Sequence, residues 1–165
     1  MISATNWKQK LLVVVVVLAG TASSAAAASA DTTAIADTIK KDVAQIVAGL
    51  NGHNAAKTTA YDAVDIVSIE CGSPATIGIE ADRKGFEQGF AHDPDWKVSL
   101  IHQTVDVASS GDLAIYRGTY NEDHGHAGVL MTHKTNFMAE FRRQKNGSWK
   151  MVWYSVTSME QSHPK

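Results

Sequence analysis

The stretch FRRQKNGSWKMVWY at residues 141–154 decides the fold. It is divided by Asn146-Gly147, a pair typical of a type I′ hairpin turn between two antiparallel strands. The apolar residues on either side of the turn fall on alternate positions: Phe137, Ala139 and Phe141 before it, then Trp149, Met151 and Trp153 after it. Alternation of period two places these residues on one face of a sheet. We expect that face to be buried.

The remainder of the second half also has the pattern of strands. We predict strands at 96–108, 112–121, 129–145 and 148–159, with a polar loop at 121–128 between the middle two. In the first of them the apolar residues change from even positions, such as Leu100, to odd positions, such as Ile101 and Val105. Such a change indicates a β-bulge near 102–104, which bends a strand. Bent strands form a sheet that curves around a cavity.

Helices are predicted in the first half of the chain. Apolar residues recur every three or four positions over 31–50, and shorter helical patterns cover 54–61 and 80–91. A β-type run at 64–69 and a brief extended piece ending at Ile77 lie between the last two. Helices followed by a series of antiparallel strands indicate an α+β domain in which the N-terminal helices cover one face of a curved sheet.

Composition excludes several classes of protein. The chain has 165 residues, of which 44% are hydrophobic, and this length suits a single domain. Its lone cysteine, Cys71, excludes an internal disulfide framework and a cysteine zinc cage. A formal net charge of −2 argues against a nucleic-acid-binding protein, which would carry a basic excess.

Residues 1–30 have the pattern of a secretory signal peptide. Lys8 and Lys10 precede an apolar run at 11–19, and Ala28-Ser29-Ala30 resembles a cleavage site. Cleavage leaves 165 − 30 = 135 residues, with 13 basic against 17 acidic side chains, a net charge of −4. The run is shorter than the roughly 20 apolar residues of a membrane-spanning helix. We expect a secreted or periplasmic domain at 31–165 without membrane contact after cleavage; an uncleaved anchor is the alternative.

Two longer motifs carry a resemblance to a known family. SGDLAIYRGTY at 110–120 and FRRQKNGSWKMVWY at 141–154 resemble the paired hairpins of the nuclear transport factor 2-like superfamily, in its SnoaL-like and ketosteroid-isomerase-like branch. YDAVDIVSIEC at 61–71 and Gly78 add weaker support. The resemblance covers nearly all of 31–165. It implies a cone-shaped, curved antiparallel sheet with the N-terminal helices packed on its concave face, and an open end that admits a small apolar molecule.

The same resemblance implies a homodimer formed through the outer face of the sheet. The residues we expect on that face include several apolar ones: Leu113, Ile115, Val152, Tyr154 and Val156. Scattered surface apolarity is the alternative explanation, since exposed apolar residues are common.

Glu70 is the first catalytic candidate. The resemblance places it where the ketosteroid-isomerase-like branch carries a carboxylate that acts as general base, a role that burial at a pocket mouth favours by raising the pKa. The positions matching the oxyanion-binding donors of that branch are Ile46 and Ala139, which donate no side-chain hydrogen bond. Steroid isomerisation is therefore not predicted. A structural carboxylate is the alternative reading of Glu70.

Further candidates come from strand parity. His102 is a second candidate acid or base, because a histidine titrates near neutral pH. Strand parity directs five more side chains into the cone as pocket lining: Tyr116, Tyr120, His133, Phe137 and Trp153. The aromatic residues also suit an ordinary core, with their polar tips satisfied at an edge, and both histidines suit structural roles.

The polar loop contains a group of metal-ligating residue types. Glu122, Asp123, His124 and His126 precede His133, and imidazole and carboxylate groups suit zinc or copper. Histidines in a glycine-containing loop are ordinarily solvated, so we expect neither a metal nor a cofactor. The sequence also has no phosphate-binding loop, dinucleotide fingerprint or nucleophile elbow.

Three hypotheses remain for the function. The first is an exported domain whose pocket binds a small apolar molecule. The second makes the same pocket a proton-transfer enzyme of isomerase, cyclase, dehydratase or hydrolase type, with Glu70 or a histidine as general base. The third is a non-catalytic dimeric interaction module that uses the outer sheet face.

Overall fold

The computed structural model describes residues 31–159 and 163–164, so the expected export signal at 1–30 lies outside the described residues. The elements follow in the order α1 Thr32–Asn51, α2 Ala55–Thr58, β1 Asp62–Glu70, β2 Thr76–Ile77, α3 Ile79–His92, β3 Lys97–Val107, β4 Leu113–His126, β5 Val129–Arg143, β6 Trp149–Ser158 and β7 His163–Pro164. None of the described helices is long and apolar enough to cross a membrane.

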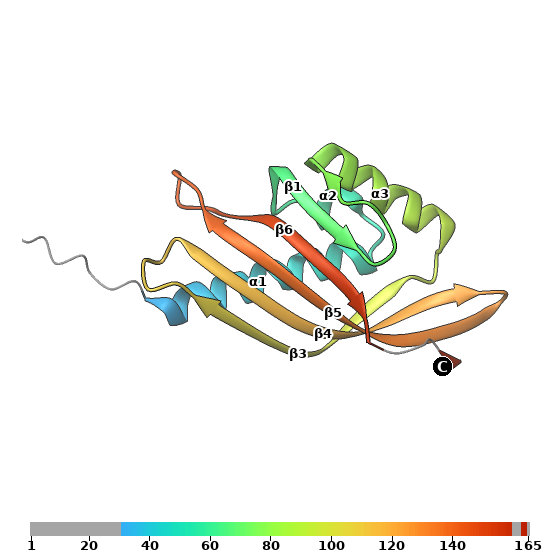
Figure 1. Ribbon diagram of the computed structural model, residues 1–165. Coiled ribbons are helices and arrows are strands. Elements are labelled where there is room, and N and C mark those ends of the chain that lie inside the picture. Colours follow the sequence, from blue (N-terminus) through green and yellow to red (C-terminus); the bar gives the residue numbers. More distant parts are fainter. Residues whose placement is uncertain (1–30, 160–162, 165) are drawn as a thin grey trace, which may run out of the picture.

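The strands form one twisted, curved sheet in the order β2-β1-β6-β5-β4-β3, and β7 pairs with β5. The pairs are antiparallel apart from β1 and β6, which run parallel. Helix α1 lies across the sheet beside β3, and α3 lies beside β1 and β2 (Figure 1). This arrangement confirms the predicted α+β cone.

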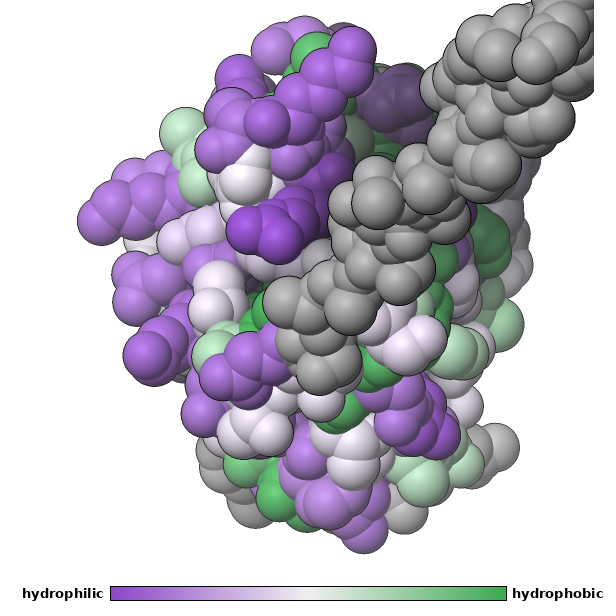
Figure 2. Space-filling view, turned by 90° about the vertical axis from the view of Figure 1, so that its left-hand side faces the viewer, coloured by the Kyte–Doolittle hydropathy of each residue, from purple (hydrophilic) through white to green (hydrophobic). Residues whose placement is uncertain are grey.

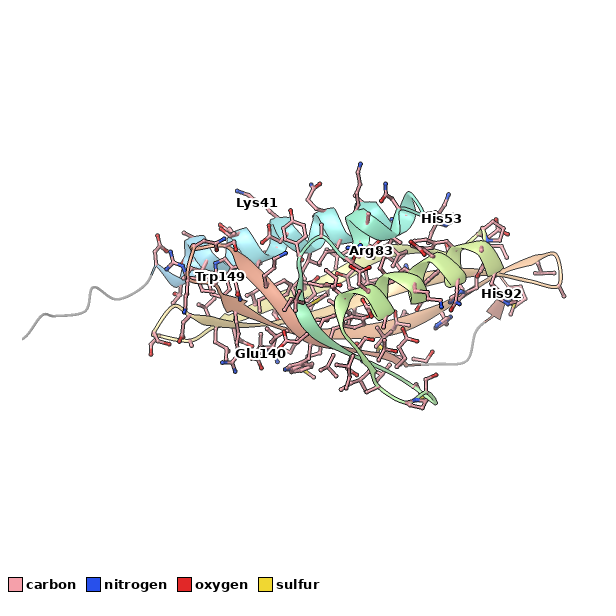
Figure 3. All side chains as sticks on the ribbon, turned by 90° about the horizontal axis from the view of Figure 1, so that it is seen from above. Lys41, His53, Arg83, His92, Glu140 and Trp149 are labelled. Atoms are coloured by element: carbon pink, nitrogen blue, oxygen red, sulfur yellow. The ribbon has the colours of Figure 1, made fainter. Side chains whose placement is uncertain are left out.

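Helix α1 covers the sheet because of its own periodicity. Its start is capped by Asp31, whose Oδ1 accepts a hydrogen bond from the backbone N–H of Ala34 at 3.0 Å. Ile39 and Val43 are buried on the inner side, while Lys41 points away from the sheet (Figure 3). The helix therefore buries one apolar stripe against the strands.

Two hairpin turns differ from the predicted ones. Residues predicted as a polar loop at 121–128 mostly continue β4, which pairs with β5 up to His126 opposite Val129. Ala127 and Gly128 both have positive φ, 51° and 79°, as a two-residue type I′ turn requires. At the predicted type I′ turn only Gly147 has a positive φ, and a wider turn closes with Gln144 N–H bonded to Ser148 O.

Bulges curve the sheet and decide which residues face inward. In β3 the extra residue is Ile101, between the pairs Leu100–Tyr120 and His102–Thr119, one position before the predicted range. A second bulge was not predicted: in β6, Met151 pairs with Phe141 but Trp153 pairs with the preceding residue, Glu140. Val152 is therefore the extra residue, and the face on which side chains lie is reversed beyond it.

The core lies between the helices and the concave face of the sheet. It is built from buried residues of α1 and the strands: Ile39, Val43, Ile46, Ile66, Ala114, Tyr116, Tyr120, Ala139, Phe141, Trp149, Met151 and Tyr154. The buried face predicted for 137–141 is therefore confirmed.

The end of the molecule at which α1 begins is mostly hydrophilic, with separate small apolar areas (Figure 2).

Candidate functional site

A cavity of about 370 Å³ lies between α1, α3 and the concave face of the sheet. Much of its wall is apolar and includes Val43, Ile46, Val47, Leu50, Phe86 and Val98. Polar side chains reach it in two groups. One is a pair of carboxyl groups from β1 and α3, and the other consists of side chains from β4 and β5. An apolar cavity with a few placed polar groups is the usual form of a small-molecule site.

The first polar group is the carboxyl pair of Asp62 and Asp82, which are only 2% and 5% exposed. Asp62 begins β1, Asp82 lies in the first turn of α3, and Tyr154 on β6 donates a hydrogen bond to Asp82 Oδ1 at 2.9 Å. Burial, and next the charge of Asp82, raise the pKa of Asp62 to about 8. At neutral pH the pair therefore holds one proton, on Asp62, whose hydroxyl can donate to Asp82.

Few donors of the protein reach this pair. Neither oxygen of Asp62, nor Oδ2 of Asp82, accepts a hydrogen bond from a donor group of the described chain. Buried carboxyl oxygens are normally hydrogen-bonded. Both residues line the cavity, but these three oxygens are themselves covered, so the Asp62 carboxyl would have to turn to reach a molecule held there.

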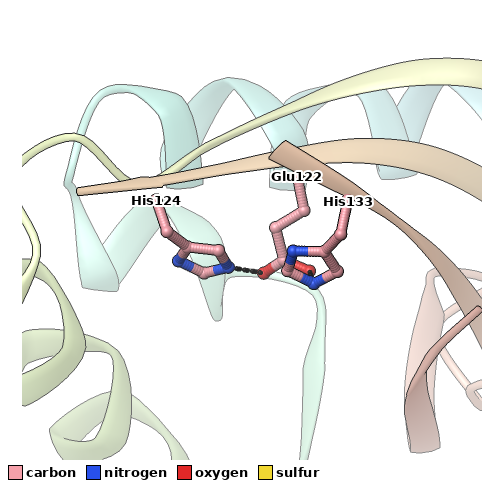
Figure 4. A group of neighbouring side chains, drawn as sticks. All are labelled: Glu122, His124 and His133. Carbon is pink, nitrogen blue, oxygen red and sulfur yellow. Dashed lines mark ion pairs between the residues drawn. The ribbon is translucent and has the colours of Figure 1, made fainter. Parts of the chain in front are cut away.

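The second polar group consists of Glu122 and His124 on β4 and His133 on β5. Nε2 of His124 is 3.5 Å from Glu122 Oε1, and Nε2 of His133 is 3.5 Å from Oε2 of the same carboxylate (Figure 4). Burial alone would raise the pKa of Glu122, but its contacts with His124 and Trp96 lower it. The contact with Glu122 in turn raises the pKa of His124, in spite of burial.

Some of the residues predicted from the sequence line the cavity. Glu70, Tyr120, His133 and Phe137 do so. Burial, followed by the charges of Asp82 and Glu122, raises the pKa of Glu70, so the carboxylates act on one another across one cavity. Tyr116 is fully buried behind this wall, where its hydroxyl donates to Gln103 Oε1 at 3.1 Å and is hydrogen-bonded to the Tyr120 hydroxyl.

Two predicted placements are corrected by the bulges. Trp153 does not line the cavity: beyond the extra residue Val152 it turns to the outer face, where its Nε1 donates to Glu140 Oε2 at 2.9 Å. His102 follows the β3 bulge and lies beside Thr104 and Arg117 in a shallow depression of the outer face, away from the cavity. Tyr154 and Val156, which we expected outside, line the cavity instead.

Four residues of the cavity were not predicted to line it: Asp62, Asp82, Glu122 and His124. For Glu122 and His124 a signal existed, because they continue the even-numbered inward positions of β4 after Tyr120. No comparable signal marks the carboxyl pair, since Asp82 has the pattern of an acidic residue that favours the start of a helix.

Comparison with known proteins identifies the fold. No family model matches the sequence, and no curated protein matches it. Several solved structures match the chain in fold. A hexachlorocyclohexane dehydrochlorinase from Novosphingobium barchaimii aligns with a TM-score of 0.70 and 12% identity, covering 78% of this chain and 88% of that one.

Two further structures extend the comparison. A ketosteroid isomerase-like protein from Erwinia carotovora atroseptica aligns with a TM-score of 0.63 and 17% identity, over 76% of this chain and 96% of that one. An NTF2-like protein of unknown function from Pseudomonas putida aligns with a TM-score of 0.66 and 19% identity, covering 84% of this chain and 96% of that one. The chain therefore has the nuclear transport factor 2-like fold, a fold that hosts many functions.

Proposed function

We propose that this nuclear transport factor 2-like domain binds a small, mainly apolar molecule with a carbonyl group in its cavity and moves a proton on it. The volume of about 370 Å³ is within the range of ligand pockets and suits a molecule of roughly two or three fused rings. Structures of the same fold include a hexachlorocyclohexane dehydrochlorinase, which supports an enzymatic role.

The observation that carries the proposal is the buried carboxyl pair. Ionised carboxyl groups are costly to bury, and a chain that needed only a core would place apolar residues there. Asp62 and Asp82 instead share one proton beside an apolar cavity. Asp62, kept neutral in this way, can turn its single hydroxyl hydrogen from Asp82 to a carbonyl oxygen of the bound molecule.

The proposed step uses Glu70 as the base. Its carboxylate removes a proton from the carbon next to the carbonyl, and the electron pair of that C–H bond forms an enolate whose oxygen is stabilised by the Asp62 hydroxyl. Glu70 then returns the proton to the same or a neighbouring carbon. The raised pKa of Glu70 suits this role, because it makes the carboxylate a stronger base than an ordinary glutamate.

Deuterium exchange tests the step without knowledge of the natural substrate. The full chain is incubated in D₂O with a panel of bicyclic and tricyclic ketones, beginning with β-tetralone. Exchange of the α-protons is followed by NMR, and binding by thermal shift. We expect Glu70→Gln to lower catalysed exchange at least a hundredfold while ligands still bind, because general bases contribute about 10² to 10⁴ to a rate.

The matched control is Asp65→Asn, which removes an exposed carboxylate from the same strand. This variant should exchange deuterium at the wild-type rate. If no ketone of the panel shifts the melting temperature, the ligand class is wrong. If ketones bind but Glu70→Gln exchanges as fast as the wild type, the role of Glu70 is wrong.

We also propose the export and the homodimer expected from the sequence. Tyr154 and Val156 line the cavity and so cannot serve the outer face. Of the expected residues, Leu113, Ile115 and Val152 remain candidates for contact between subunits, and the exposed Met138 joins them on the outer face. N-terminal sequencing of the protein from the exported fraction tests cleavage after residue 30, and light scattering at micromolar concentration tests the dimer.

A further inference from the structure

Three side chains of the cavity wall converge on one point. Glu122 on β4 pairs directly with His133 on β5, and His124 follows two residues later on the same face of β4. One ligand atom from each lies within 4.8 Å of the others. Figure 4 shows the Glu122 carboxylate between the two imidazole rings. Neighbouring strands, rather than a loop, therefore fix the relative positions of all three groups.

The orientation of His124 is set by a carboxylate on its far side. Its Nδ1 is 3.0 Å from Asp93 Oδ2, so this nitrogen carries a proton and donates it. Oδ1 of Asp93 accepts the backbone N–H groups of Asp95 and Gly125, each at 3.0 Å. A side chain at Gly125 would meet Asp95 Oδ2 at 2.8 Å, so the glycine permits this approach. The lone pair of Nε2 in the neutral ring is then directed toward Glu122.

The position of Glu122 is also fixed by neighbouring side chains. Trp96 Nε1 donates a hydrogen bond to its Oε1 at 2.7 Å, and the Trp96 ring stacks on His124 at a centroid distance of 6.2 Å. The rings of His124 and His133 are also stacked, 5.1 Å apart and 11° from parallel. Asp93 behind His124 and Trp96 behind Glu122 are the kind of hydrogen-bonding support that usually orients a metal ligand, whereas the buried Nδ1 of His133 has no such partner among the described residues.

The separations are compatible with a cation held between the three side chains. The two nitrogen–oxygen distances are 3.5 Å, each to a different oxygen of Glu122 and longer than the roughly 2.7–3.2 Å of a hydrogen bond. Ligand atoms about 2.1 Å from a tetrahedral zinc ion are themselves about 3.4 Å apart. Because one ligand atom from each residue lies within 4.8 Å of the others, the side chains would have to close by up to about 1.4 Å to hold an ion.

We propose that Glu122, His124 and His133 bind a divalent transition-metal ion, with Zn²⁺ as the best fit to two imidazoles and one carboxylate. Three protein ligands leave a position open, and all three residues line the cavity. This site shares no residue with Asp62, Asp82 or Glu70, so it does not depend on the proposed proton transfer.

The test is a titration of the untagged full chain, freed of metal by a chelator, with Zn²⁺ alone in a calorimeter. We expect one ion per chain. Glu122→Gln and His133→Gln should each weaken binding at least tenfold. Asp93→Asn, which removes the support of His124, should weaken it about ten- to a hundredfold. The control His102→Gln removes an exposed histidine of the outer face and should leave binding unchanged.

Cobalt provides a second measurement that needs no variant. Co²⁺ bound by three protein ligands in four-coordinate geometry absorbs strongly in the visible, whereas the hydrated ion absorbs weakly. An intense spectrum that Zn²⁺ abolishes at one equivalent supports the site. The proposal is overturned if the wild type binds no Zn²⁺ at micromolar concentration, or if folded His133→Gln binds it as tightly as the wild type does.

Discussion

Replacing Asp62 with asparagine should change how stability depends on pH. Asparagine has the size of a protonated aspartate and can donate the same hydrogen bond to Asp82, but it never ionises. In the wild type the raised pKa of Asp62 means that the folded state keeps a proton which the unfolded chain releases near pH 4. The stabilisation that comes from this retained proton is thus fully present at acid pH and is lost as the pH rises toward 8.

The magnitude follows from the difference between the two pKa values. While the folded pair holds one proton and the unfolded chain none, the free energy of unfolding falls by about 1.4 kcal/mol per pH unit. Between pH 5 and pH 7.5 the wild type should therefore lose roughly 3 kcal/mol that the Asp62→Asn variant retains. The two proteins should be similarly stable near pH 4, and the variant more stable at neutral pH.

Urea unfolding at half-unit steps from pH 4.5 to 7.5 measures this difference. The other titratable groups are present in both proteins, so their effects on stability cancel in the comparison. Asp65→Asn, on the exposed side of β1, should follow the wild-type curve. Parallel curves for the wild type and Asp62→Asn would refute the shared proton, and with it the hydrogen bond proposed for a bound carbonyl.

Three further predictions concern packing and capping. Gly118→Ala should lower the free energy of unfolding by about 1–3 kcal/mol in urea, since its Cβ would lie 2.5 Å from Tyr120 Cε2 and 2.8 Å from the Tyr116 hydroxyl. Phe141→Ala should lower it by about 3–5 kcal/mol, because this ring is fully buried; a loss under 1 kcal/mol would contradict that burial. Asp31→Ala should cost about 1 kcal/mol by removing the cap of α1, and an unchanged urea midpoint would argue against the cap.

The sequence was sufficient for the main elements and for the α+β class of the fold. Helix periodicity located α1 to within one residue at each end, and a change of parity located the β3 bulge to within one residue. Each of these signals is local, because the residues that report it are neighbours in the chain. The failed predictions of which side chains face the cavity depend on contacts between distant segments, whereas the two differing hairpin turns are local.

The β6 bulge illustrates why contacts between distant segments could not be predicted from local sequence patterns. Trp149, Met151 and Trp153 alternate without a break in the sequence, yet pairing with β5 inserts Val152 and turns Trp153 outward. Likewise, nothing local brings Asp62 beside Asp82, since they meet only when α3 packs against β1. The carboxyl pair therefore could not be predicted from the sequence.

The single extra residue in β6 also has an evolutionary meaning. Beyond Val152 the cavity wall is formed by Tyr154, Val156 and Ser158, while the alternate residues Trp153, Ser155 and Thr157 lie outside. Loss of the Val152 codon would remove the bulge and leave both sets on their present faces, because Trp153 would then follow Met151 directly in the pairing with β5. A relative of the same length that paired Val152 with Glu140, without a bulge, would instead present an indole and two small polar groups to its ligand, a new specificity from a one-residue change of register rather than several substitutions.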